Sequence, residues 1–278
     1  DIMKKIILLV FFSSSLFSQI STKKIENWIS KNNDLDGSVV SISVKRIDKD
    51  KKIVGSGNDI YMTPASNVKI LTVLGSINYG DSIPIINYKV YNDTLKISPT
   101  GYPLLSHPKY LDKDLEKFLK KFKHIVYHTP KTDLDKYGPG WAWDDYNNYY
   151  QAERSEMPIY GNVIQAIKKS NGDIEITPDT YKIVYDFEQK KQIHRSETDN
   201  NFSLNPSLFK SGDTIYSPFI ISRKNTISLL ENVLGKKVEF KKEELKDYNV
   251  YNSSQVDDIY SAILKDSDNL ISESIAAN

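Results

Sequence analysis

The sequence predicts an α+β fold in which a β-rich middle segment is inserted between two parts of one domain. Apolar residues recur at helical spacing near both ends of the chain, and short runs typical of strands fill residues 82–216. The length of 278 residues, 39% of them hydrophobic, suits one large or two modest globular domains. We therefore expect one domain made of residues 19–81 and 217–278, with residues 82–216 inserted into it.

The first 18 residues have the features of a secretory signal peptide. Met3 is followed by two lysines, an apolar run from Ile6 to Phe12 and small residues near Ser18. This run is shorter than the roughly 20 apolar residues of a transmembrane helix, so membrane association is not indicated. We expect residues 1–18 to be removed and the mature protein to be periplasmic.

The composition argues against several classes of protein. Thirty-seven basic and 36 acidic residues leave a net charge of +1 without a long single-sign run, which argues against a nucleic-acid partner. Cysteine is absent, so neither disulfides nor thiolate metal sites can form. The sequence indicates no cofactor, and it leaves the oligomeric state open.

A helix and a hairpin are expected before residue 60. Residues 25–31 suit a short helix, and residues 40–44 alternate apolar and polar side chains as a half-buried strand does. A polar turn at 48–52 then leads to a return strand at 53–54.

A second helix is expected around the stretch "TPASNVKILT". Thr63 can cap this helix, and Pro64 fits its first turn because a missing N–H costs nothing there. Ser66 would then lie in the first turn, with Lys69 above it on the same face. The apolar surface of the helix would come from Ile70, Leu71, Val73 and Leu74.

Strands dominate residues 82–216, and helical periodicity returns after them. The expected strands lie within 87–97, 124–128, 173–178 and 181–187. The expected helices are 115–122, 223–235 and 256–263. Gly235 is a natural stop for the second of these helices.

Ser66 and Lys69 are the first candidate catalytic residues. A lysine can serve as base for a serine only after it loses its proton, and lowering its pKa from about 10.4 to ~7 requires about 4 to 5 kcal/mol of environmental bias. The positive end of a helix acts in that direction. The same spacing recurs elsewhere, so alone it does not separate a catalytic pair from a solvated one. The other pairs are Ser21 and Lys24, Ser106 and Lys109, and Ser207 and Lys210.

A second motif, Ser267-Asp268-Asn269, follows the expected helix 256–263. S-D-N is the companion motif of S-x-x-K enzymes. Its serine can relay a proton between the lysine and a leaving amine, and its asparagine amide can hold the lysine or the peptide carbonyl of the substrate. By itself the triplet suits a helix cap equally well.

Other candidate sites carry weaker signals. His124 and His128 share one face of an expected strand, but the sequence offers no third ligand for zinc. No G-x-S-x-G motif surrounds any serine, so the sequence gives no evidence for a Ser-His-Asp hydrolase. Asp144 and Asp145 are too close together to be argued as a glycosidase pair. Aromatic residues that can stack on sugars or pack the insertion are Tyr137, Trp141, Trp143, Tyr146, Tyr149 and Tyr150.

Four stretches together resemble the class C low-molecular-mass penicillin-binding proteins, which are D-alanyl-D-alanine carboxypeptidases and endopeptidases. These stretches are "PASNVK" after a hairpin, "YGPGWAWDD", "MPIYGNVI" and "SDNLISES". The resemblance covers nearly the whole mature chain. It implies a transpeptidase-like domain, an antiparallel sheet flanked by helices, and it implies that the β-rich insertion is the one that marks this group.

The resemblance also implies a reaction. Ser66 becomes the acyl-forming nucleophile, Lys69 its general base, Ser267 the proton relay and Asn269 the substrate-orienting amide. The substrates would be peptidoglycan stem peptides, cleaved at the D-alanyl-D-alanine bond or, in an endopeptidase, at a cross-link. β-Lactam antibiotics would acylate the same serine.

One motif of that family is not where it is expected. Lys-Thr/Ser-Gly should follow S-D-N, yet only residues 270–278 come after Asn269. "KSG" at 210–212 stands in the wrong order, so we interpret it as a turn. We therefore expect the C-terminal part of the sheet to be missing from this chain, and the chain as given to be inactive or poorly folded. Two alternatives stay open: a penicillin-recognising sensor that is acylated without turnover, and a cell-wall scaffold whose pocket has decayed.

Overall fold

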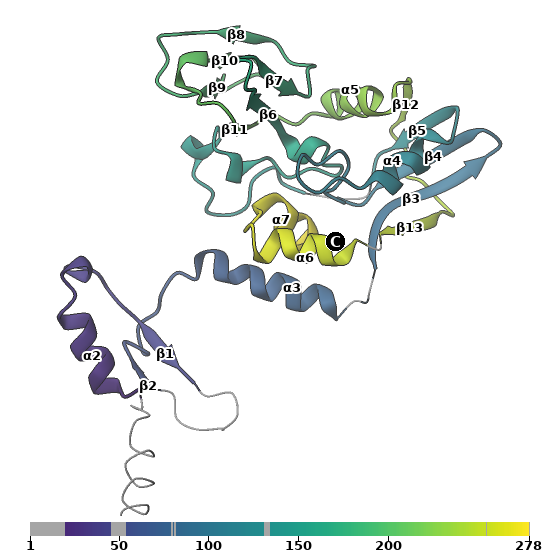
Figure 1. Ribbon diagram of the computed structural model, residues 1–278. Helices are drawn as coiled ribbons and strands as arrows, with labels where there is room; N and C mark the ends of the chain where they lie inside the picture. The colour runs from purple at the N-terminus through teal and green to yellow at the C-terminus, as the bar shows by residue number, and fades with distance from the viewer. Residues whose placement is uncertain are drawn as a thin grey trace, which may run out of the picture. The chain divides into compact units, whose positions relative to one another are not determined.

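A computed structural model describes most of the chain (Figure 1). The described residues are 20–45, 54–78, 80, 82–130, 134–253 and 255–277. The expected signal peptide and the expected turn at 48–52 lie outside them. The chain divides into two compact units, Asp1–Ala65 and Ser66–Asn278. This division differs from the expected limits at residues 81 and 216, which stay a prediction.

The first unit contains a helix and a hairpin. The helix α2 (Thr22–Ser30) follows Ser21, whose Oγ accepts a hydrogen bond from the N–H of Lys24, and a 3₁₀ turn, η1 (Asn33–Leu35), comes after it. Strand β1 (Ile42–Val44) pairs antiparallel with β2 (Val54–Ser56). The expected helix and strand pair are confirmed. The first of the three other S-x-x-K pairs is thus a helix cap.

A 3₁₀ turn, η2 (Ala65–Val68), leads into the helix α3 (Lys69–Ile77). Ala65 has a φ of 44°, in the left-handed region, so the residues before it do not continue the helix. The N-cap of α3 is Val68, without a capping side chain. The prediction that Thr63 caps this helix with Pro64 in its first turn is therefore wrong.

Only part of the expected apolar surface of α3 is buried. Val73 is 6% exposed and belongs to the main core cluster, where α3 packs against two C-terminal helices. Ile70, Leu71 and Leu74 are each more than half exposed.

A five-stranded mixed sheet forms the centre of the second unit (Figure 1). Its order is β12 (Val238–Lys241), β5 (His124–His128), β4 (Thr94–Pro99), β3 (Ile83–Tyr91) and β13 (Asn249–Ser253). The neighbours β12–β5 and β5–β4 are parallel, and β4–β3 and β3–β13 are antiparallel. Strands from beyond residue 216 thus complete a sheet that begins at residue 83. The antiparallel sheet implied for the catalytic domain stays a prediction.

Two smaller sheets follow β5 in the chain. One consists of β11 (Thr214–Pro218), β6 (Val163–Lys168) and β7 (Ile174–Thr177), and the other of β8 (Ile183–Tyr185), β10 (Phe202–Leu204) and β9 (Ile193–Arg195). The short 3₁₀ turns between strands are η3 (Trp143–Asp145), η4 (Tyr149–Gln151), η5 (Tyr160–Asn162) and η6 (Pro206–Leu208). The "KSG" stretch is a turn before β11, as expected: the N–H of Lys210 donates to Asp213 at 2.8 Å, and Gly212 has a φ of 86°.

The described residues of this unit form four further helices: α4 (Lys113–Lys120), α5 (Arg223–Leu234), α6 (Val256–Leu264) and α7 (Asn269–Ala277). The three expected after residue 100 are confirmed, and α5 stops at Gly235, which has a φ of 65°. Figure 1 shows α3, α6 and α7 side by side. This three-helix layer brings the S-x-x-K and S-D-N motifs together.

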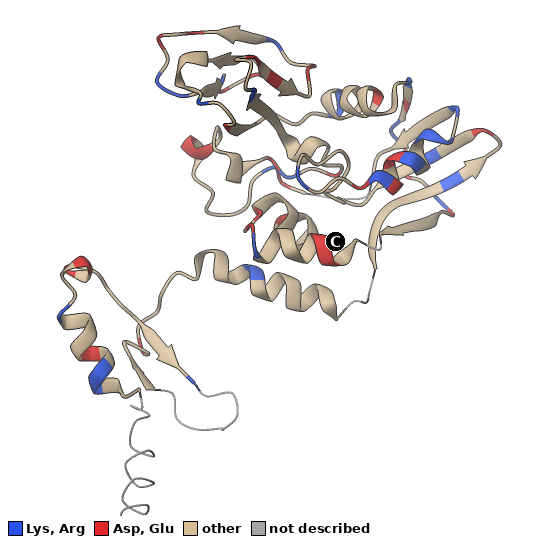
Figure 2. Ribbon diagram, viewed as in Figure 1, with Lys and Arg blue, Asp and Glu red and all other residues tan. Residues whose placement is uncertain are grey.

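Basic and acidic residues are interspersed along the elements, as α4 shows clearly (Figure 2). Within the part of the chain that the structure describes, no helix combines the length and the apolar character that crossing a membrane requires.

Candidate active site

Hydrogen bonds connect all four predicted site residues into one cluster centred on Lys69. The Nζ of Lys69 lies 3.2 Å from the Oγ of Ser66 and 3.2 Å from the Oγ of Ser267, and it also donates to the Oδ1 of Asn269. The Oγ of Ser267 donates to the Oγ of Ser66 at 3.0 Å. The structure therefore joins the two motifs into one cluster, while the catalytic roles of these residues stay a prediction.

The local backbone explains why Ser66 and Lys69 meet. Ser66 lies in the 3₁₀ turn η2, and Lys69 is the first residue of α3. Residues three apart lie on the same face of a helical turn, so the hydroxyl and the amine can form their hydrogen bond. The position of Lys69 also places its amine near the positive end of α3, which disfavours an ammonium.

Ser267 occupies an unusual backbone conformation. Its φ is 56°, a left-handed value that costs free energy for any residue other than glycine. The loop around it is tied to both helices, because the N–H of Asp268 donates to the carbonyl of Ala262 at 3.1 Å and its Oδ1 accepts from the N–H of Ile271 at 2.9 Å. These bonds hold Ser267 between the end of α6 and the start of α7.

The side-chain amide of Asn269 is oriented by two partners. Its Oδ1 accepts from Lys69, and its Nδ2 donates to the backbone carbonyl of Tyr150 at 2.8 Å. Since Lys69 can only donate to this amide and a carbonyl can only accept, this orientation satisfies both partners. The sequence indicated Tyr150 only as an aromatic side chain, because the contact of a backbone carbonyl leaves no signature in the sequence.

Burial lowers the pKa of Lys69. The residue is only 7% exposed, and removal from water disfavours its charged form. The carboxylates of Asp268 and Glu273 oppose this shift by stabilising the ammonium. A lysine whose pKa is lowered can accept the proton of Ser66, which is the chemical requirement for a serine nucleophile with a lysine base.

A cavity of about 450 Å³ borders this cluster. It is lined in part by Lys109, Tyr149, Tyr150, Tyr216, Asn269 and Leu270. Two of the six aromatic residues singled out in the sequence therefore lie beside Asn269. Ser66 and Ser267 are exposed, so a substrate in this region can reach both hydroxyls.

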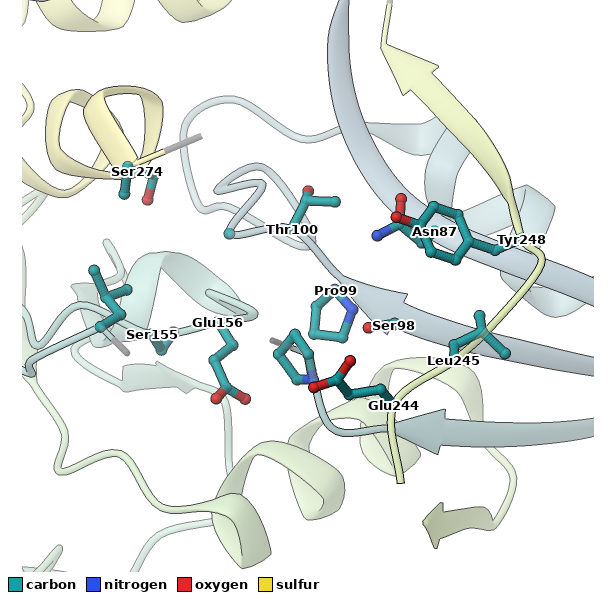
Figure 3. Close-up of a pocket in the computed structure, with 14 residues that line it drawn as sticks. Asn87, Ser98, Pro99, Thr100, Ser155, Glu156, Glu244, Leu245, Tyr248 and Ser274 are labelled. Carbon is teal, nitrogen blue, oxygen red and sulfur yellow. The ribbon is translucent and has the colours of Figure 1, made fainter. Parts of the chain in front are cut away.

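A second cavity, of about 320 Å³, lies toward the other end of α7 (Figure 3). Its lining includes Ser98, Thr100, Glu156, Glu244 and Ser274. Burial raises the pKa of Glu156, with Arg223 opposing the shift. None of the four clustered residues lines this cavity, whereas Asn269 lines the first one.

Two of the remaining candidates from the sequence, His128 and Asp145, make hydrogen bonds within the fold. The Nδ1 of His128 lies 3.0 Å from the backbone carbonyl of Glu243, while His124 is exposed. Asp145 accepts hydrogen bonds from Asn148 and Tyr150 at 2.8 and 2.9 Å. Across the described ranges, no group of three or more His, Cys, Asp and Glu side chains is placed to hold a metal ion.

Comparison with known proteins identifies similar folds only among solved structures. No family model and no curated protein matches this chain. Penicillin-binding protein 4 from Haemophilus influenzae is similar with a TM-score of 0.53 and 17% identity, over 77% of this chain and 56% of that chain. A second structure of that protein, in complex with a β-lactam, is similar with a TM-score of 0.51 and 15% identity, over 92% of this chain and 63% of that chain.

These similarities show a fold of the penicillin-binding-protein kind. The α+β fold expected from the sequence is therefore confirmed at that level. The chain spans less than two thirds of the length of the two matched chains. The class C assignment, the inserted domain and the missing part of the sheet stay predictions.

Proposed function

We propose that this protein is a serine-type D-alanyl-D-alanine peptidase that acts on peptidoglycan stem peptides through an acyl-enzyme on Ser66. One observation carries the proposal: the buried amine of Lys69 lies within 3.2 Å of the hydroxyls of both Ser66 and Ser267. The similarity of the fold to penicillin-binding protein 4 supports it.

The residues divide the proton transfers among them. Lys69 takes the proton of Ser66 as its Oγ bonds to the carbonyl carbon of the substrate. The C–N bond then breaks, and the leaving amine receives a proton that Lys69 returns by way of Ser267, whose Oγ contacts both residues. Water releases the acyl group from Ser66 in the second half of the reaction.

Asn269 holds Lys69 within this arrangement. Both polar atoms of its amide are engaged by protein groups, the Nζ of Lys69 and the carbonyl of Tyr150. This supports the first of the two roles considered for the amide, which is holding the lysine. Orienting the substrate would require the Nδ2 to exchange the carbonyl of Tyr150 for that of the substrate.

The finer parts of the proposal follow from the resemblance in the sequence. The protein would be exported to the periplasm, would be inhibited by β-lactams, and would act as a carboxypeptidase or, on cross-links, as an endopeptidase. The cavity beside Asn269 offers room for part of a stem peptide.

The test uses the intact protein and a fluorescent penicillin. We expect covalent labelling, a mass adduct on the peptide that contains Ser66, and loss of both in Ser66→Ala. The matched control is Ser207→Ala, which changes the serine of another S-x-x-K pair and should label like the wild type. Labelling of Ser66→Ala at the wild-type rate would overturn the proposal.

A second measurement separates a peptidase from a sensor. A peptidase releases D-alanine from a peptide that ends in D-alanyl-D-alanine, and it does so repeatedly. A stable acyl-enzyme that releases no D-alanine would favour the penicillin-recognising sensor instead.

A further inference from the structure

One short segment contacts the residues on both sides of Ser267. The Nζ of Lys109 lies 2.7 Å from the Oδ2 of Asp266, and the hydroxyl of Tyr110 donates to the same oxygen. On the other side of Ser267, the Oδ2 of Asp268 lies 3.9 Å from the Nε2 of His107. Residues 106–110, here called the clamp segment, thus bracket the serine of the S-D-N motif.

The clamp segment is itself firmly anchored. Leu104 and Leu105, which precede it, are buried in the core, and the carbonyl of Leu105 accepts from the N–H of Tyr160 at 3.1 Å. Within the segment, the Nδ1 of His107 accepts from the N–H groups of Lys109 and Tyr110 at 3.2 Å each. Because this backbone is well anchored, the side chains of Lys109 and Tyr110 can hold Asp266 in one position.

Ser267 needs such support. Its left-handed φ of 56° is unfavourable for a serine, and such a conformation persists only where neighbouring contacts enforce it. Asp268 is held by α6 and α7. Asp266, on the other side, is held by Lys109 and Tyr110.

We propose that Lys109 and Tyr110 are positioning residues for the proton relay: by fixing Asp266 they keep the Oγ of Ser267 within reach of Ser66 and Lys69. This inference rests on the proposed function, since a relay matters only if Ser66 is acylated. It also gives a role to the Ser106 and Lys109 pair, whose spacing matches the nucleophile motif but whose lysine acts on another loop.

The experiment measures acylation of the intact protein by a fluorescent penicillin in stopped flow, which separates the dissociation constant from the first-order acylation rate. We expect Lys109→Met and Tyr110→Phe to lower the acylation rate, the former about tenfold. Because Tyr110, unlike Lys109, does not line the cavity beside Asn269, Tyr110→Phe should leave the dissociation constant nearly unchanged. Lys109→Arg should restore most of the rate. The matched control is Lys123→Met, which breaks the exposed ion pair with Asp93 and should have no effect.

A double-mutant cycle distinguishes positioning from general destabilisation. If Lys109 acts through the hydroxyl of Ser267, Lys109→Met should have almost no further effect in a Ser267→Ala background. An equal loss in both backgrounds would overturn the inference. Tyr110→Phe removes a single hydroxyl, and it replaces Lys109→Met in this cycle if Lys109→Met folds poorly.

The outcomes for the two proposals differ. If the wild type is acylated at Ser66 and both clamp variants react at the wild-type rate, the inference fails and the proposed function stands. If the wild type is not acylated at all, the proposed function fails and the inference fails with it.

Discussion

The amine of Lys69 lies 3.2 Å from the Oγ of Ser267, although the two residues are 198 positions apart in the chain. The contact exists because α3 packs against α6 and α7, so that the start of one helix faces the loop between the other two. A single buried amine thus links the S-x-x-K motif to the S-D-N motif, and its protonation state determines whether it can accept a proton from either serine.

Replacing Lys69 should remove most of the reactivity of Ser66. We expect Lys69→Met to lower the rate of acylation by a fluorescent penicillin by about 10²- to 10⁴-fold, the contribution typical of a general base. Lys113→Met is a matched control, because Lys113 is the first residue of α4 as Lys69 is of α3, and it is exposed. A rate in Lys69→Met close to that of the control would mean that another group removes the proton.

Neutralising Asp268 should extend activity to lower pH. The carboxylate of Asp268 raises the pKa of Lys69 by stabilising the ammonium, so Asp268→Asn should lower that pKa further. Because the proposed acylation requires the neutral amine, the rate should rise as pH increases through this pKa, and the acid limb of the pH–rate profile should move to lower pH. An asparagine oxygen can still accept from the N–H of Ile271. An acid limb that stays at the same pH or moves to higher pH would contradict the prediction.

Arg154 and Glu273 should move the same limb in opposite directions. Glu273 also raises the pKa of Lys69. Arg154 lies 3.3 Å from the carboxylate of Glu273 and partly neutralises that negative charge. We expect Glu273→Gln to shift the acid limb to lower pH and Arg154→Met to shift it to higher pH. Glu116→Gln, which changes a carboxylate paired with a lysine on α4, is the control and should leave the limb unchanged. Shifts of equal sign in the two variants would exclude this electrostatic account.

Local patterns in the sequence predicted those helices and helix ends that depend on residues close together in the chain. The apolar spacing of Leu115 and Leu119 identified α4, and both residues are buried in its core-facing side. Gly235 was expected to stop α5, and it adopts the left-handed conformation that glycine tolerates best. The three-residue spacing of Ser66 and Lys69 likewise predicted that the two side chains would share a face.

Contacts between distant segments could not be predicted in this way. Nothing in the sequence indicated that β12 and β13 would complete the sheet begun by β3, because strand pairing depends on the global fold. The left-handed φ of Ala65 also has no local signature, and it moved the helix start away from Thr63. The carbonyl of Tyr150 and the side chain of Lys109 reach the S-D-N loop only through tertiary packing.

The backbone of Ser267 makes a prediction about stability that does not depend on catalysis. With a φ of 56°, an alanine at this position keeps the steric cost of the left-handed region, whereas a glycine does not. We expect Ser267→Gly to be more stable than Ser267→Ala by about 1 kcal/mol in the free energy of unfolding, measured by urea denaturation. Both variants should lose the relay hydroxyl equally.

Ser228 supplies the matched comparison, because it is exposed in the middle of α5, where the backbone is right-handed. There the order should reverse, with Ser228→Gly less stable than Ser228→Ala by about 1 kcal/mol, since glycine is the poorer helix former. If glycine were the less stable substitution at both positions, the left-handed conformation of Ser267 would not be the source of strain. The need for the clamp segment to hold that conformation would then lose its physical basis.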